Sequence, residues 1–363
     1  MAREIKHVFP GGNTSTGFYS FYEYILDKEI AKRIICIKGG PGTGKSTLMK
    51  TIGKTFFEKG YDVEFHHCSS DNNSLDGIVI KNLNIALLDG TSPHVVDPVY
   101  PGAVDEILNM GECWQEFGFE KDKDKVISTV KTISKKFKRA YRYFGAARNI
   151  LDDWSAFNED AKNLNEVIKI KETLKKQILS DLPINTYGCE RHLFMTALTP
   201  NGIISFKESH SKSYEKVFVL KGGPNTCKSD LLKYIGEEAL KRGLFVEFYH
   251  DPFIPERIEN IIIPMLSIAI FSSNEIHSIK LTNSTEIDMD ALLNKDILLK
   301  NKDEIDFDKT QFYFLINKGL SSIKEAKILH DSLETYYIKN MDFNKIEHIT
   351  QDLIKRIEEY SNH

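Results

Sequence analysis

The stretch Lys38-Gly-Gly-Pro-Gly-Thr-Gly-Lys-Ser46 follows a short apolar run at Ile34–Ile37 and precedes a segment with helical spacing. It recurs as Lys221-Gly-Gly-Pro-Asn-Thr-Cys-Lys-Ser229, and the difference between 221 and 38 is 183 residues. The same offset places Val63-Glu-Phe65 onto Val246-Glu-Phe248. A match that keeps its register over so long a stretch indicates that one core has been duplicated within the chain.

A strand, a glycine-rich loop and a helix, in this order, are the context of the Walker A phosphate-binding motif. Glycines let the loop backbone wrap closely, so that its N–H groups and the helix N-terminus point at phosphate oxygens. Lys45 would add a positive charge between the terminal phosphates, and the Ser46 hydroxyl would coordinate Mg²⁺. The predicted nucleotide-binding residues are Gly39, Gly40, Pro41, Gly42, Thr43, Gly44, Lys45, Ser46 and Thr47.

The apolar segment Leu83–Leu88 ends at Asp89, a pattern typical of the Walker B strand. The Asp89 carboxylate would then hold Mg²⁺ through water, which makes Ser46 and Asp89 the predicted metal-side residues. Lys45 and Asp89 are the predicted catalytic residues. The alternative is that Asp89 only begins a turn with Gly90.

Ligands of open α/β sheets bind beyond the carboxyl ends of the strands. Further candidates to orient water or a phosphoryl acceptor are therefore Asp71, Asp76, Thr91 and His94, and the alternative for each is a cap or turn residue. Since no acidic residue follows Asp89 directly, the sequence favours slow hydrolysis, a group supplied by a partner, or phosphoryl transfer to an acceptor.

The second loop departs from the motif at several positions. Asn225 and Cys227 replace two loop glycines, Asp230 replaces Thr47, and Ser272 aligns with Asp89. We expect the Cys227 side chain to enter space that the loop backbone needs and the Asp230 charge to oppose a triphosphate. This degenerate second site, with Gly222, Lys228 and Ser229 retained, is predicted not to catalyse, although binding of a nucleotide or another anion stays open.

Each half ends in long helical patterns, with apolar or small residues alternating four and three apart. The simplest interpretation is an antiparallel helical hairpin in each half, at about 120–180 and about 315–360. The predicted fold class is α/β: a tandem duplication of a P-loop NTPase core, mainly parallel sheet flanked by helices, with each copy followed by its hairpin. The predicted domains are residues 1–188 and 189–363.

Seven basic residues and no acidic residue lie between Lys131 and Arg148. The three interpretations are a solvated helix face, contact with an acidic partner such as nucleic acid, and an arginine that reaches phosphate. The sequence does not choose between them.

The 363 residues are 41% hydrophobic and 28% charged, a composition that excludes wholesale disorder and fibrous repeats. Formal net charge is −4, which does not indicate a nucleic-acid binder. No apolar run reaches the 18 residues of a membrane span, the N-terminus lacks an apolar signal region, and the five cysteines form no C-x-x-C pair. We therefore expect a cytoplasmic protein that does not bind a membrane.

With both loops in view, the chain resembles a bacterial family of tandem P-loop NTPases, described as predicted ATPases or nucleotide-kinase-like proteins. The resemblance rests on Gly39–Thr47, Asp71–Gly77, Asp89–His94 and Gly222–Ser229. It implies ATP as the nucleotide but supplies no substrate. The first hypothesis is a Mg²⁺-dependent ATPase or kinase-like phosphotransferase active in the N-terminal half, with an unknown acceptor or protein partner. The alternatives are a nucleotide-gated switch with little turnover and a nucleic-acid-associated ATPase that uses helix 131–148.

Overall fold

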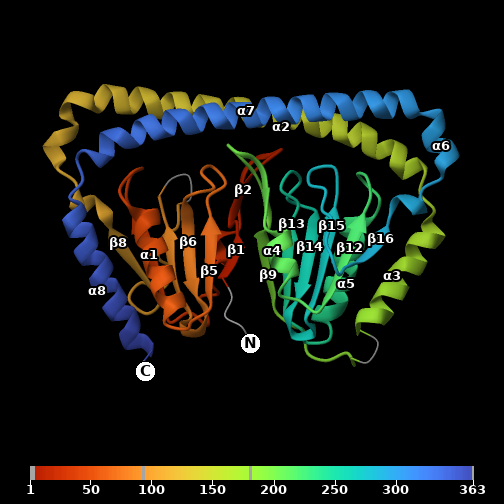
Figure 1. Ribbon diagram of the computed structural model, residues 1–363, viewed down its shortest axis with the longest axis horizontal. Helices are drawn as coiled ribbons and strands as arrows, with labels where there is room; N and C mark the ends of the chain where they lie inside the picture. The colour runs from red at the N-terminus through yellow and green to blue at the C-terminus, as the bar shows by residue number, and fades with distance from the viewer. Residues whose placement is uncertain (1–4, 92–94, 180–181, 362–363) are drawn as a thin grey trace.

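The computed structural model describes residues 5–91, 95–179 and 182–361. Two similar α/β halves lie side by side, and two long helices run across the top of both (Figure 1). The strands of the first half are β1 (Ile5–Val8), β4 (Arg33–Lys38), β5 (Val63–His67), β6 (Leu75–Ile80), β7 (Ile85–Asp89) and β8 (Asp105–Asn109). Those of the second half are β9 (Glu190–Phe194), β12 (Lys216–Lys221), β13 (Val246–His250), β14 (Ile258–Ile263), β15 (Ile268–Ser273) and β16 (Thr285–Asp288).

Each half contains one six-stranded sheet of the same topology. The strand orders are β1-β5-β6-β7-β4-β8 and β16-β12-β15-β14-β13-β9, and each order reversed matches the other. In the first sheet β4 is parallel to β7 and β8, and β1 is parallel to β5, while β6 is antiparallel to both of its neighbours. The predicted duplication and the α/β class are confirmed, with a mixed sheet that is mostly parallel. Two hairpins, β2 (Gly11–Thr14) with β3 (Gly17–Ser20) and β10 (Thr196–Thr199) with β11 (Gly202–Ser205), complete the strands.

The helices that cover the sheets begin at the two glycine-rich loops. α1 (Lys45–Glu58) buries Leu48, Met49 and Ile52 against the first sheet, and α5 (Lys228–Leu240) does the same in the second half. Apolar residues at this spacing form the core-facing stripe of an amphipathic helix. The remaining helices are α2 (Lys123–Asp160), α3 (Leu164–Leu179), the short α4 (Lys207–Ser211) and α6 (Lys295–Lys300), α7 (Lys302–Ile338) and α8 (Phe343–Ser361). Within the described ranges, none of them combines the length and apolar character that spanning a bilayer requires.

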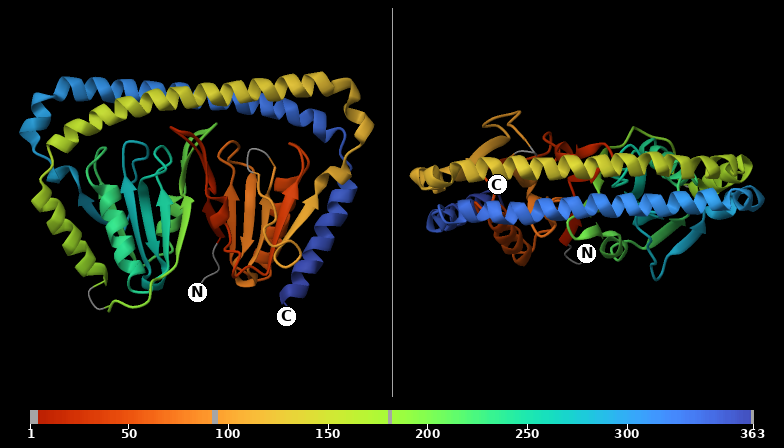
Figure 2. Two further views of the ribbon diagram at one scale, coloured as in Figure 1. Left: turned by 180° about the vertical axis from the view of Figure 1, so that it is seen from behind. Right: turned by 90° about the horizontal axis from the view of Figure 1, so that it is seen from above.

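The two helices of each half do not form a hairpin, so that prediction was wrong. α2 and α7 instead lie side by side over both halves and run in opposite directions (Figures 1 and 2). Phe144 of α2 packs where α7 has Gly319, and the Ser322 hydroxyl donates to the Lys136 carbonyl oxygen at 2.9 Å. The apolar spacing of each helix predicts that it packs against another helix, but it does not identify that helix.

The crossing carries each following helix to the opposite half. α3 packs against α5 of the second half, and α8 packs against the first-half core that includes α1 (Figure 1). Helices of 38 and 37 residues extend for about 55 Å at about 1.5 Å per residue, long enough to reach across both sheets. The predicted boundary between residues 188 and 189 separates the two sheets. However, α3, which precedes this boundary, packs on the second sheet, and α8, which follows it, packs on the first.

Two buried ion pairs join the halves near the centre of the molecule. Lys6 of β1 donates to both carboxylate oxygens of Glu247 on β13, at 2.7 and 2.6 Å. Arg191 of β9 contacts Glu64 of β5 in the same way, at 3.0 and 2.7 Å. Each pair therefore connects the first strand of one half to the sheet of the other, and together they fix how the two sheets sit.

Lys6→Met is expected to destabilise the fold by about 3 kcal/mol, because among the described residues it leaves the buried Glu247 carboxylate with Arg191, 3.7 Å away, as its remaining ion-pair partner. Lys59→Met is the matched control, since Lys59 pairs with Glu358 at an exposed site and its loss should cost less than about 1 kcal/mol. Urea unfolding measures both. Equal losses would contradict a structural role for the central pairs.

Buried and partly buried histidines make stability sensitive to mild acid. Burial lowers the pKa of His67, His210 and His250 to about 4 in the folded protein. In the unfolded chain a histidine has a pKa of about 6.5, so below that pH the unfolded state binds more protons. Stability should therefore fall as the pH drops from about 6.5 toward 4. Urea midpoints between pH 7 and 5 measure this, and His210→Gln should flatten the slope, whereas an unchanged slope would contradict the assignment.

Candidate functional site

The first glycine-rich loop connects β4 to α1 at the upper edge of the first sheet (Figure 1). Gly42 and Gly44 have φ angles of 70° and 86°, values in the left-handed region that favours glycine. The Thr43 hydroxyl donates to the Gly40 carbonyl oxygen at 2.8 Å and closes the loop on itself. The conformation is thus a compact turn that ends at the first residue of α1, Lys45.

Lys45 and Asp89 come together at this loop, as the sequence predicted. β4 and β7 are neighbouring parallel strands with Ile37 opposite Asp89, so the end of β7 lies beside the start of the loop. The Lys45 ammonium donates to the carbonyl oxygens of Gly39 and Gly40 at 2.6 and 2.8 Å. It also lies 3.5 Å from Oδ2 of Asp89. A cation and a carboxylate are therefore held at the carboxyl edge of the sheet, where α/β proteins bind ligands.

Two hydroxyl groups fix the ends of this arrangement. Thr91 Oγ1 donates to the Gly39 carbonyl at 2.9 Å and lies 3.2 Å from the Gly39 N–H, while the Thr91 N–H donates to Asp89 at 2.9 Å. Thr91 is thus a positioning residue for the loop and for Asp89. Ser46 Oγ accepts a hydrogen bond from the Leu75 N–H at 3.0 Å. The Thr47 side chain is exposed.

The other predicted residues have different surroundings. Asp71 accepts from the Ser74 hydroxyl at 2.8 Å and lies 3.4 Å from the Lys327 ammonium of α7. Asp76 is buried near the start of β6, and because β6 is antiparallel to β5 and β7, this end of the strand lies at their carboxyl edge. Burial and the charge of Asp76 raise the pKa of the Tyr22 hydroxyl well above its usual range. His94 lies outside the described residues. Asp71 therefore lies at the border of the site, and Asp76 lies buried at the same edge of the sheet as Asp89.

The C-terminal end of α7 covers the loop, which the sequence did not indicate. A Cβ atom on Gly40 would lie 2.5 Å from Cε1 of Tyr337, and one on Gly42 would lie 3.0 Å from the carbonyl oxygen of Glu334. Both loop positions thus favour glycine for close packing, and Gly42 favours it for its backbone conformation as well. The contact between α7 and the loop could be predicted only if it were already known that α7 crosses from the second half to the first.

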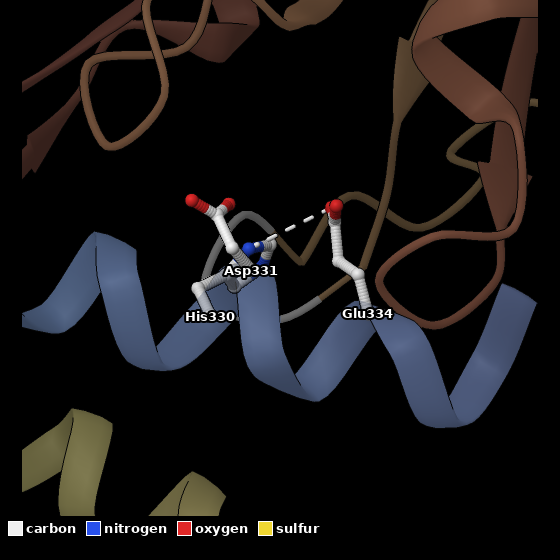
Figure 3. Close-up of side chains that lie close together, drawn as sticks. All are labelled: His330, Asp331 and Glu334. Atoms are coloured by element: carbon white, nitrogen blue, oxygen red, sulfur yellow. Dashed lines mark ion pairs between the residues drawn. The ribbon is translucent and has the colours of Figure 1, made fainter.

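Polar side chains of α7 project toward the first half, away from α2, as Figure 3 shows for His330, Asp331 and Glu334. Each offers a ligand atom within 4.8 Å of the others. His330 Nδ1 lies 3.6 Å from Glu334, while Asp331 pairs with Lys327. Since all three are at least partly exposed and Asp331 already has a cation, we assign no metal ion to this cluster.

The second loop keeps the conformation of the first despite its lost glycines. Asn225 and Cys227 have φ angles of 54° and 65°, and the Lys228 ammonium donates to the carbonyl oxygens of Gly222 and Gly223 at 2.6 and 2.5 Å. Ser229 Oγ accepts from the Ile258 N–H, as Ser46 does from Leu75. The Cys227 side chain is therefore accommodated without a change in the backbone of the loop, while its effect on phosphate binding stays a prediction.

The side chain that caps the second loop is Asp290, a residue that the sequence analysis did not identify. Its carboxylate accepts a hydrogen bond from the Gly223 N–H at 2.8 Å, so a loop amide that could bind phosphate already has an anionic partner. The end of α2 adds a second contact, because the Asn158 amide donates to the Pro224 carbonyl at 2.7 Å. The corresponding neighbour of the first loop is Gly111, which has no side chain to act in this way.

A cavity of about 230 Å³ adjoins the second loop and is lined by four carboxylates that the sequence did not single out, Asp251, Glu256, Glu259 and Glu275. Burial, with the charges of Glu259 and Glu275, raises the pKa of Asp251 to about 7. Glu259 forms a buried ion pair with Lys207 at 2.7 Å. The basic residues Lys228, Lys233 and Arg257 also line the cavity, so its walls carry both signs of charge. The loss of function in this half stays a prediction.

The basic helix of residues 131–148 lies within α2 above both sheets. Lys136 pairs with Glu325 of α7, Arg148 pairs with Asp152 at 2.8 Å, and Arg139 contacts the Tyr143 hydroxyl at 3.3 Å. Part of the positive charge is thus used within the helix pair. Contact with nucleic acid remains a prediction.

No family model matches the chain, and comparisons with curated proteins and with solved structures find no match either.

Proposed function

We propose that the first half binds ATP with Mg²⁺ and acts as a P-loop ATPase or a kinase-like phosphotransferase. The observation that carries the proposal is the arrangement of the first loop. Two glycines in left-handed conformation, a lysine at the first position of the helix and a carboxylate from the neighbouring parallel strand meet at one edge of the sheet. These are the residue types that phosphate and its metal ion require, in the spacing of the Walker A motif.

The roles of the residues follow from their contacts. The Lys45 ammonium, which now donates to two loop carbonyls, would donate to phosphate oxygens and stabilise charge on the transferring group. Ser46 and Asp89 would hold Mg²⁺, directly and through water, while the Thr91 N–H donates to Asp89 and keeps it oriented. These residues fit the metal by donor type, because Mg²⁺ prefers hydroxyl, carboxylate and water oxygen ligands.

Lys45→Ala should weaken binding of ATP·Mg²⁺ by about 100-fold or more, because hydrogen bonds to charged groups contribute about 1.5–3 kcal/mol each. Lys228→Ala should change it little, since the second loop is already capped by Asp290. Calorimetric titration of both variants, with thermal melts to verify folding, measures the difference. Equal losses of affinity would contradict the assignment of the site to the first half.

A second candidate is a nucleotide-gated switch with little turnover. The observation that favours it is the packing of Tyr337 and Glu334 of α7 directly on the first loop. Because α7 continues over the second half and pairs with α2, a change in the loop would be transmitted along a rigid helix pair. Such a device needs a nucleotide that binds the two arrangements with different affinity.

Hydrogen exchange with and without ATP·Mg²⁺ tests the switch. We expect the amides at residues 330–338, at the end of α7, to change their exchange rates on binding, and those at residues 155–160, at the end of α2, to change less. Negligible turnover together with this change would favour the switch over the enzyme. Rapid turnover without any change in α7 would exclude the switch.

A further inference from the structure

An aromatic cavity of about 400 Å³ lies beside the first loop. Trp114, Phe119 and Tyr337 line it together with Val126 and Ile127 of α2. The ring centroids of Phe119 and Tyr337 are 5.2 Å apart, and those of Trp114 and Phe119 are 6.0 Å apart in an edge-on arrangement. Trp114 keeps 38% of its surface exposed, so the rings do not simply fill one another's space.

One residue contacts both the cavity and the loop. Tyr337 lines the cavity and also packs against Gly40, the second residue of the glycine-rich loop. On the other side, Met110 begins the short helix after β8 and would lie 3.0 Å from a Cβ on Gly39. Trp114 follows that helix directly. A ligand with its anionic end on the loop would therefore have an aromatic wall within reach.

Backbone hydrogen bonds hold the two walls together across more than two hundred residues of sequence. The Gln115 N–H donates to the Asn340 carbonyl at 2.8 Å, and the Asp342 N–H donates to the Cys113 carbonyl at 2.7 Å. The buried Asn340 amide donates to the Gly118 carbonyl at 3.3 Å. Hydrogen bonds therefore fix the two walls of the cavity relative to each other.

The second half lacks these aromatic residues at the matching positions. The bridge between Trp114 and Met341 corresponds to the bridge between Leu293 and Lys162. Leu293 therefore stands where Trp114 does, and Asn158 contacts Gly223 where Tyr337 contacts Gly40. The wall of three aromatic rings accompanies the loop that keeps its glycines, whereas the second loop has Trp154 of α2 nearby, 3.9 Å from a Cβ on Gly223. This difference links the wall to the ligand of the first loop.

We propose that this cavity receives the purine ring of the nucleotide whose phosphates lie on the first loop; the inference rests on the proposed function. Flat aromatic side chains offer stacking surfaces for a base, and a pocket of this volume is in the range that small ligands occupy. Glu120 and Lys123, which also line it, supply an acceptor and a donor for the polar edge of the ring or for the ribose. The binding determinants of base and phosphate are therefore separable.

The test uses the full chain with Trp154→Phe, which leaves Trp114 as the single tryptophan. ATP·Mg²⁺ should change the fluorescence of Trp114, and tripolyphosphate·Mg²⁺ should change it much less. Trp114→Leu, which installs the residue of the second half, should weaken ATP about tenfold in calorimetric titrations, the size expected for the loss of one stacked base. Its affinity for tripolyphosphate should not change, and Phe119→Leu should behave alike.

Phe117→Ala is the matched control, because Phe117 lies in the same segment, is 79% exposed and does not line the cavity. It should leave both affinities unchanged. If tripolyphosphate and ATP bind the parent chain and Trp114→Leu alters neither, the base does not lie here, while the proposed function stands. If neither ligand binds the parent chain, the proposed function fails and the inference fails with it.

Discussion

The antiparallel pairing of α2 and α7 is the constraint on which the rest of the molecule depends. Each of these helices starts over one half and ends on the glycine-rich loop of the other, so neither loop has its surroundings without the distant half of the chain. Because Gly319 has no side chain, the Phe144 ring packs directly against α7 and the two helices approach closely at the centre. Below them, the paired Lys6 and Glu247 and the paired Arg191 and Glu64 set the spacing of the sheets. The single chain thus has the architecture of a symmetric pair that exchanges its helices.

Once duplicated, the two halves have diverged around nearly identical loops. Both loops keep the left-handed backbone at their fourth and sixth positions, and both lysines donate to loop carbonyls. The differences lie in what surrounds them: Asp290 on one loop amide and carboxylates in the adjoining cavity of the second half, against Gly111 and an aromatic wall in the first. Loop sequence alone therefore understates the difference between the sites, because most of it comes from side chains that lie far away in the sequence.

The sequence was sufficient to predict features that depend on residues close together in the chain, but not contacts between helices that are far apart in the chain. The duplication, the strand–loop–helix unit and the meeting of Lys45 with Asp89 all follow from residues close to one another in the chain or on neighbouring strands. The hairpins were wrong because an apolar seam such as Ala140–Leu151 specifies that a helix is packed, but not against which neighbour. Tyr337 and Glu334 were missed for the same reason, since each reaches the loop only after α7 has crossed the molecule, and Trp114 was missed because its ring partner Tyr337 comes from that helix. Cys227 shows the converse error, because a non-glycine residue there is accommodated at φ 65° without loss of the loop.

A crystal structure of the chain grown with Mg²⁺ and a non-hydrolysable ATP analogue tests the central claim most directly. We expect the triphosphate on the loop at residues 39–46, with the Lys45 ammonium moved from the carbonyl oxygens of Gly39 and Gly40 to phosphate oxygens. Asp290 should still occupy the Gly223 amide, with no nucleotide beside it. Electron density for the analogue at the second loop, or a first loop that stays empty at saturating concentration, would contradict the assignment.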